Sequence, residues 1–86
     1  MENEVEIQKV EINEFYKLIG KNVAKIRKSK NISQLELSLK LGYKSVSLVS
    51  GAEICYNGVH FNLEHLYKIS KILNTNINEF FVKTSN

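Results

Sequence analysis

One segment near the middle of the chain constrains the fold most, because it predicts two short helices joined by a single glycine. Ser33 and Glu36 have the spacing of a capping box, in which each side chain accepts a hydrogen bond from the other residue's backbone N–H. Leu37 then takes an inward position, and Gly42 supplies a turn where a positive φ carries no steric penalty. We therefore expect one helix that starts after Ser33 and a second over residues 45–52.

Longer amphipathic patterns flank this pair. Asn13 is a good N-cap, the apolar residues after it recur every three or four positions, and Asn31 suits a left-handed helix end. Asn62 and Asn76 have the same capping role for a fourth and a fifth helix. The expected buried face of the fourth helix comprises Leu63, Leu66, Ile69 and Leu73. The sequence thus predicts an all-α domain of five helices over residues 13–83.

The first dozen residues carry a different signal. Their apolar side chains alternate in part with charged ones, which suits an extended segment, although the same residues are compatible with a helical start. We assign residues 1–12 as a short N-terminal arm. Five glutamates against one lysine give residues 1–14 a net charge of −4, so the arm is acidic.

The rest of the charge is unevenly distributed. The chain carries a net charge of +3. Residues 15–45 contain seven lysines and one arginine against one glutamate, a net charge of +7, whereas residues 46–86 balance. A basic stretch of this kind favours a polyanionic partner such as a nucleic acid.

Composition argues against several classes of protein. Cys55 is the only cysteine and the chain has no aspartate, so neither an internal disulfide nor a Ser–His–Asp triad can form. His60 and His65 together with Cys55 lack the fourth ligand and the spacing of a zinc site. No apolar run approaches the ~20 residues of a membrane helix, and no signal peptide opens the chain. We expect a cytoplasmic protein that is not an enzyme, holds no cofactor or metal, and has no membrane partner.

Two stretches of the chain carry a family resemblance, IRKSKNISQLELSLKLGYKSVSLVSGAE and NLEHLYKISKILNTNINEFF. The first is similar to the helix-turn-helix of the phage-repressor and Cro-like (XRE) family, and the second to that family's fourth and fifth helices. Together they cover about residues 15–82, and the SQ-x-x-L-x-x-x-x-G pattern is their most specific part. The resemblance implies a five-helix lambda-repressor-like domain that binds double-stranded DNA.

Helix-turn-helix geometry also suggests which residues contact DNA. The first short helix crosses the phosphate backbone, while the second enters the major groove and must present small or polar side chains. The residues expected to contact DNA are Lys28, Ser33, Gln34, Lys44, Ser45, Val46, Ser47 and Ser50. The resemblance further implies that Gln34 contacts a phosphate and orients the second helix, and that Arg27 pairs with Glu53 inside the domain.

The sequence also departs from the family pattern. The outward positions of the second short helix, where relatives carry Lys, Arg or Gln, are here Val46, Ser47, Ser50 and Gly51. The loop after Glu53 is longer than usual and lacks proline. Within that loop, Tyr56 and Phe61 either pack over the fourth helix or contact a partner, and we favour packing.

We therefore hypothesise a sequence-specific transcriptional regulator, a repressor or autoregulator that acts as a homodimer on a palindromic operator. Family members often dimerise near the C-terminus, so the expected dimer interface comprises Phe80, Phe81 and Val82, unless Phe80 lies in the core with Phe81 half exposed. The alternative function is a protein-interaction module of the same fold, of the antitoxin or adaptor type. Leu35 and Leu39, at positions that relatives leave polar, either form a contact surface for a partner or for the arm, or pack partly against the first helix or the loop over residues 54–61. The contact surface and an acidic arm lying over the basic face motivate this alternative.

Overall fold

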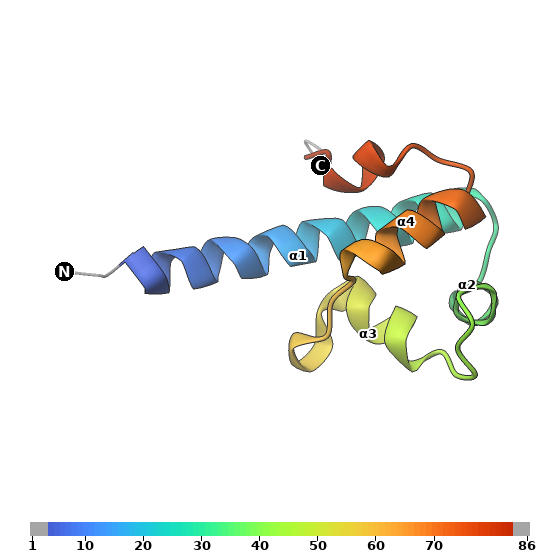
Figure 1. Cartoon of the computed structure of the whole chain (residues 1–86), viewed down its shortest axis with the longest axis horizontal. Helices are drawn as coiled ribbons and strands as arrows, with labels where there is room; N and C mark the ends of the chain where they lie inside the picture. Colours follow the sequence, from blue (N-terminus) through green and yellow to red (C-terminus); the bar gives the residue numbers. More distant parts are fainter. Residues whose placement is uncertain (1–3, 84–86) are drawn as a thin grey trace.

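The computed structural model describes residues 4–83, and every regular element within them is helical. The long helix α1 runs the length of the molecule, with η2 on one side and α2 and α3 on the other (Figure 1). The α-helices and 3₁₀ helices are α1 (Glu4–Ser29), α2 (Gln34–Lys40), α3 (Ser47–Ile54), η1 (Tyr56–Gly58), α4 (Leu63–Ile72) and η2 (Ile77–Phe81). The all-α class is confirmed, but a single 3₁₀ segment, η2, stands where a fifth helix was expected.

The start of α1 differs from the expectation. The helix begins at Glu4, and Asn13 lies inside it rather than at its N-cap. The predicted arm is therefore wrong for residues 4–12, while residues 1–3 lie outside the described part of the chain. Glutamate, glutamine and lysine are good helix formers, and acidic residues in the first turn complement the helix dipole. These preferences outweigh the partial alternation of apolar residues.

At the start of α2, the structure contains the Ser33 half of the predicted capping box. Ser33 accepts a hydrogen bond from the backbone N–H of Glu36 at 3.0 Å, and Gly42 turns the chain with a φ of 96°. The α3 helix, however, begins at Ser47 rather than at Ser45. The Ser45 hydroxyl accepts a hydrogen bond from the backbone N–H of Ser47 at 3.4 Å. A side chain that bonds its own backbone in this way favours a turn over a helix.

The core lies where α1, α3 and α4 meet, and Leu37 closes it from α2. Its buried apolar residues are Ile19, Val23, Leu37, Val49, Ala52, Phe61, Leu66, Ile69, Leu73 and Phe80. Leu66, Ile69 and Leu73 thus take the inward positions that the sequence predicts for α4. Leu63 does not, because it occupies the first position of α4 and lines a surface groove with Phe15 and Phe81.

A close backbone contact sets the separation between α1 and α3. A methyl group at Gly20 would lie 2.5 Å from the carbonyl oxygen of Ala52 and 2.6 Å from that of Glu53. No side chain larger than hydrogen fits there unless the helices move apart. The sequence pattern gave no sign of this role, since Gly20 lies in the middle of a helix, where glycine is unfavourable.

We predict that Gly20→Ala destabilises the fold by about 1–3 kcal/mol, because the methyl group overpacks the α1–α3 contact. Gly51→Ala is the matched control, since its methyl group would lie 3.5 Å from the side chain of Val59, an ordinary van der Waals distance. That variant gains helix propensity and stays at or above wild-type stability. Urea unfolding followed by circular dichroism compares the two. Equal midpoints for the two variants would contradict a tight contact at Gly20.

Candidate nucleic-acid interface

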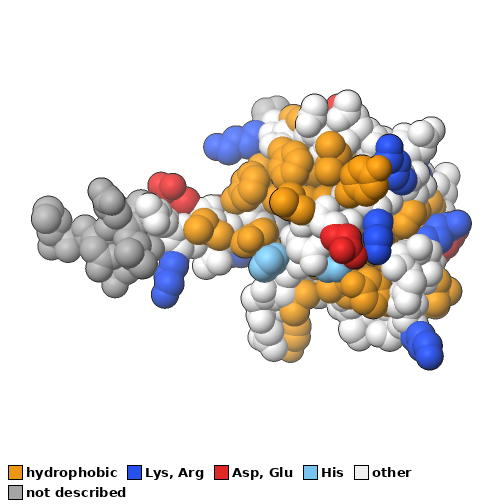
Figure 2. All heavy atoms as spheres, in the orientation of Figure 1, with side chains coloured by type: hydrophobic (Ala, Val, Ile, Leu, Met, Phe, Trp, Pro, Cys, Tyr) orange, Lys and Arg blue, Asp and Glu red, His pale blue; other side chains and the backbone are white. Residues whose placement is uncertain are grey.

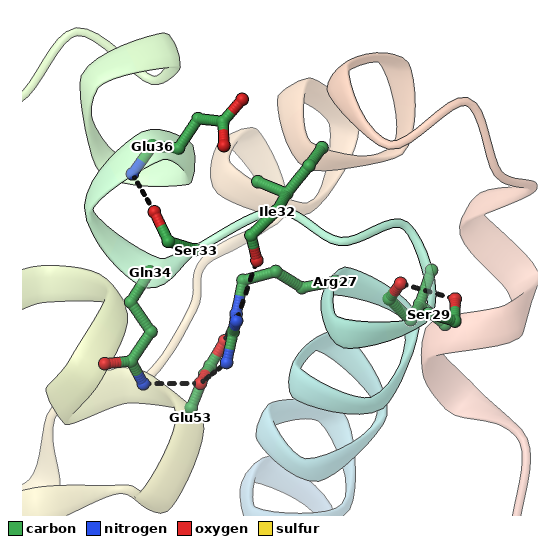
Figure 3. A network of polar contacts seen from close by, with 8 residues as sticks. Arg27, Ser29, Ile32, Ser33, Gln34, Glu36 and Glu53 are labelled. Carbon is green, nitrogen blue, oxygen red and sulfur yellow. Dashed lines mark hydrogen bonds and ion pairs between the residues drawn. The ribbon is translucent and has the colours of Figure 1, made fainter.

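A buried ion pair joins the end of α1 to α3. Arg27 donates from Nε to Glu53 Oε2 at 2.7 Å and from Nη2 to Glu53 Oε1 at 3.0 Å, and both side chains are buried (Figure 3). Arg27 Nη1 also donates to the carbonyl oxygen of Ile32 at 2.9 Å. A two-pronged contact of this kind fixes both the distance and the orientation of the two groups. The structure thus brings Arg27 and Glu53 together as the resemblance implies.

Gln34 extends this network to α2. Its Nε2 donates to Glu53 Oε1 at 2.8 Å, and its side chain is half-buried beside the ion pair (Figure 3). One carboxylate therefore receives hydrogen bonds from the last turn of α1 and from the first residue of α2. The three residues hold the helix pair α2–α3 at a fixed angle to α1, and we call them the Arg27 network.

A second polar link holds the turn between α2 and α3. The backbone N–H of Asn62 donates to His65 Nδ1 at 3.0 Å, which completes the capping box of α4. Since Nδ1 accepts this bond, the proton of the neutral ring is on Nε2, which lies 3.0 Å from Tyr43 Oη in the turn. This link carries no sequence signal, because its partners are far apart in the chain.

The residues expected to contact DNA lie around the ends of these two helices. Lys44, Ser45 and Ser47 are exposed in the turn and in the first turn of α3, whereas Val46 and Ser50 are half-buried. Ser33 is exposed before α2, and Lys28 is exposed in the last turn of α1, which leads directly to Ser33. Gly51 does not face outward as expected, because it is buried against Val59.

The family comparison covers most of this arrangement. A family model described as helix-turn-helix matches residues 23–80, a range that contains α2, α3, α4 and most of η2. The chain belongs to the phage-repressor and Cro-like (XRE) helix-turn-helix family. This is a family of DNA-binding regulatory domains rather than of enzymes. Searches of curated proteins and of solved structures give no match.

In this helix-turn-helix protein, only part of the loop after α3 packs against the rest of the domain. Phe61 is buried in the core, as the packing interpretation requires, whereas Tyr56 is exposed. His60 stacks on Tyr16 of α1 with 3.7 Å between ring centroids. The loop is thus anchored to α1 through His60, while Tyr56 projects into solvent beside the end of α3.

The C-terminal segment is secured by a residue that carried no sequence signal. Asn22 Nδ2 donates to the carbonyl oxygens of Phe80 at 2.9 Å and Val82 at 2.8 Å. Phe80 is completely buried in the core, so it is not available to a partner chain. Phe81 is half-buried and Val82 is exposed, which leaves these two of the three expected interface residues at the surface.

Other chemistry has little support in the described residues. Between residues 4 and 83, no group of three or more His, Cys, Asp or Glu side chains is arranged to hold a metal ion. Burial raises the pKa of the Cys55 thiol, although Lys17 opposes this effect, and the protonated thiol is a poor nucleophile. None of the helices within that range has the length and hydrophobicity to cross a lipid bilayer.

We predict that Arg27→Ala lowers the free energy of unfolding by about 3–5 kcal/mol, because it leaves the buried Glu53 carboxylate without its partner. Lys25→Ala, an exposed lysine in the same helix, is the control and shifts stability little. Thermal unfolding by calorimetry measures both. Closely similar melting temperatures for the two variants would show that the ion pair does not contribute this much to the stability of the fold.

Protonation of His65 is expected to weaken the fold at acid pH. Burial lowers the pKa of His65 below its ordinary value of 6.5, and the nearby Lys68 and His60 act in the same direction against Glu64. Well above pH 6.5 the ring is neutral in both states, and its contribution to stability is complete. As the pH falls from there through the lower pKa of the folded state, the unfolded chain binds the proton first, so this contribution is lost.

We therefore predict that wild-type stability declines between about pH 7 and pH 5 more steeply than that of His65→Gln, which carries no titrating ring. His60→Gln leaves the α4 cap in place but removes one of the minor causes that lower the pKa of His65, so its decline is expected to lie between those of the wild type and His65→Gln. Urea midpoints across this pH range provide the measurement. Parallel curves for wild type and His65→Gln would refute the proposed role of the ring.

Proposed function

We propose that this protein is a sequence-specific DNA-binding transcriptional regulator, a repressor or autoregulator that acts as a homodimer on a palindromic operator. The observation that carries the proposal is the Arg27 network, which fixes α2 and α3 at one angle while the turn between them stays polar and exposed. A rigid helix pair is needed for two elements to meet phosphate and base edges together.

Phosphate contacts follow from the positive and hydroxyl groups around the helix pair. Lys28 and Lys44 lie exposed before α2 and before α3, and Ser33 exposes its hydroxyl between them in sequence. The amide nitrogen of Gln34 has two hydrogens, and only one is needed for its bond to Glu53. The second hydrogen can be donated to a phosphate, which supports the family role of this residue.

Base recognition on α3 would rely on short side chains. The hydroxyls of Ser47 and Ser50 can donate to or accept from several bases, and Val46 offers an apolar contact for thymine methyl groups. None of these side chains makes a two-pronged contact to one base. Specificity therefore depends more on DNA shape and on the separation of two half-sites, about 34 Å for one helical turn.

A second candidate function is a protein-interaction module of the antitoxin or adaptor type. Leu35 and Leu39 favour it, since they lie one turn apart on α2 with 50% and 55% of their surface exposed. The acidic segment does not support this second function by covering the basic face, because residues 4–12 extend α1 away from α2 and α3 (Figure 1). DNA binding is therefore the better-supported proposal.

We predict that selection from random duplexes yields a palindromic site bound at least ~10³-fold more tightly than scrambled DNA. Affinity falls steeply as the salt concentration rises. The Lys44→Ala variant makes the slope of log K against log salt less negative by about one, as expected for the loss of one phosphate contact. Lys9→Ala is the matched control, since Lys9 is exposed near the far end of α1. Fluorescence anisotropy at several salt concentrations measures the affinities of the wild type and of both variants. Absence of a preferred site at high protein concentration would instead favour the interaction module.

A further inference from the structure

The first third of α1 projects beyond the body of the molecule. The longest dimension of the protein is 46 Å against 28 Å and 21 Å for the other two, and this length follows α1 (Figure 1). Every side chain from residue 8 to residue 15 is exposed, and Phe15 is the first of them that contacts the body, by stacking on Phe81. From residue 8 to residue 14, the side chains of the projecting end are therefore not buried against the rest of the chain.

Such a segment is expected to need a partner. An isolated helix shorter than ~12–15 residues is marginal in water, because most helical stability comes from packing an apolar face. The projecting end carries apolar side chains, with Val10 64%, Ile12 50% and Phe15 47% exposed. Hydrophobic side chains on this end continue onto the body of the molecule (Figure 2). A continuous apolar surface of this kind marks an interaction site.

The charges beside Val10 and Phe15 are ordered along α1. A groove of about 610 Å³ runs along α1, and Val10 and Leu18 form part of its apolar floor. The charged side chains that α1 gives to it are, in chain order, Glu11, Glu14, Lys17 and Lys21, and the C-terminal segment adds Lys83. The groove is thus acidic toward the N-terminus of α1 and basic toward the middle. If a second copy of α1 runs in the opposite direction beside the first, each acidic position of one helix faces a basic position of the other.

We propose that this groove binds the same groove of a second copy, with the two α1 helices antiparallel. The proposal deepens the homodimer of the proposed function and rests on it. A two-fold axis beside Tyr16 sets Glu14 against the partner's Lys17 and Glu11 against the partner's Lys21, and each pair occurs twice. A parallel arrangement would instead set like charges against each other. Charge complementarity therefore selects a second copy, and it selects one orientation.

The apolar residues fit the same arrangement. Phe15 and Leu18 lie close to the proposed two-fold axis, so those of both copies come together at the centre of the interface. Phe15 also stacks on Phe81, with 6.0 Å between ring centroids and 14° between ring planes. Lys83 lines the groove as well. The α1 surface thus continues into the C-terminal segment, where Phe81 and Val82 are at the surface.

The ion pairs would set orientation more than affinity. Within one chain, Lys17 Nζ lies 3.8 Å from Glu14 Oε1 with both side chains largely exposed, a contact of little worth. Because exposed charges are well solvated, burial of the apolar residues supplies most of the attraction between copies. Like charges across the interface would still be unfavourable, so charge reversal is a sharp test.

The test uses two complementary variants of the full chain. Glu11→Lys with Glu14→Lys makes the α1 side of the groove entirely basic, and Lys17→Glu with Lys21→Glu makes it entirely acidic, while Lys83 of the C-terminal segment stays unchanged in both variants. Each variant alone is expected to self-associate at least ~10-fold more weakly than wild type, because all facing charges repel. An equimolar mixture regains wild-type affinity, since every acidic position then meets a basic one. Sedimentation equilibrium at low salt measures the masses.

Glu36→Lys is the charge-matched control for the single variant Glu14→Lys, because Glu36 lies outside the groove, on α2. The Glu36→Lys variant self-associates as the wild type does, whereas Glu14→Lys associates more weakly. Circular dichroism melts establish that each variant is folded. A wild-type protein that remains monomeric well above micromolar concentrations overturns the proposal, and so does a mixture that associates no better than its components.

DNA binding separates this proposal from the proposed function. Should the wild type bind a selected operator while the basic variant, the acidic variant and their mixture all dimerise as wild type does, the regulator stands and the α1 interface fails. Should the charge-reversal pattern hold while no preferred duplex is found, the interface stands and DNA-dependent regulation fails.

Discussion

The arrangement of this domain depends on one buried carboxylate. Glu53 receives hydrogen bonds from Arg27 of α1 and from Gln34 of α2, and it is itself part of α3. Taking charges out of water is expensive, so such a pair adds less to stability than its short distances suggest. Its geometric effect is larger, because three helices meet at one group with a fixed direction for each donor. The bond from Gln34 links α2 to α3 and those from Arg27 link α1 to α3, so the relative placement of the three helices depends on polar contacts inside the domain.

Much of the fold could be predicted where the deciding interaction is local. The Ser33 cap, the positive φ of Gly42 and the left-handed end at Asn31 each depend on a few neighbouring residues, and all three are present. The two helix starts that were misplaced, at Glu4 and at Ser47, are cases in which competing local preferences had similar strength. The sequence contained both possibilities, and propensity in one case and a serine-bonded turn in the other decided between them.

The candidate site was predictable in part. The family pattern identified Arg27, Gln34 and Glu53, because their types and spacing are specific. It could not identify the bond between Tyr43 and His65, nor the close approach at Gly20, since these depend on which segments meet in space. At Phe80 and Phe81 the sequence left two interpretations open, and the packing of η2 on α1 decides between them by burying the first ring and leaving the second half-exposed.

The bonds from Asn22 to the C-terminal segment have a consequence for how this protein can change. The amide holds two carbonyl oxygens of the main chain, at Phe80 and Val82, and these atoms are present whatever side chains the positions carry. Substitutions at 81 and 82 can therefore change the polarity of the surface, while the backbone of residues 80–82 keeps its position. Descendants of this gene could acquire new binding preferences at that edge without first rebuilding the scaffold.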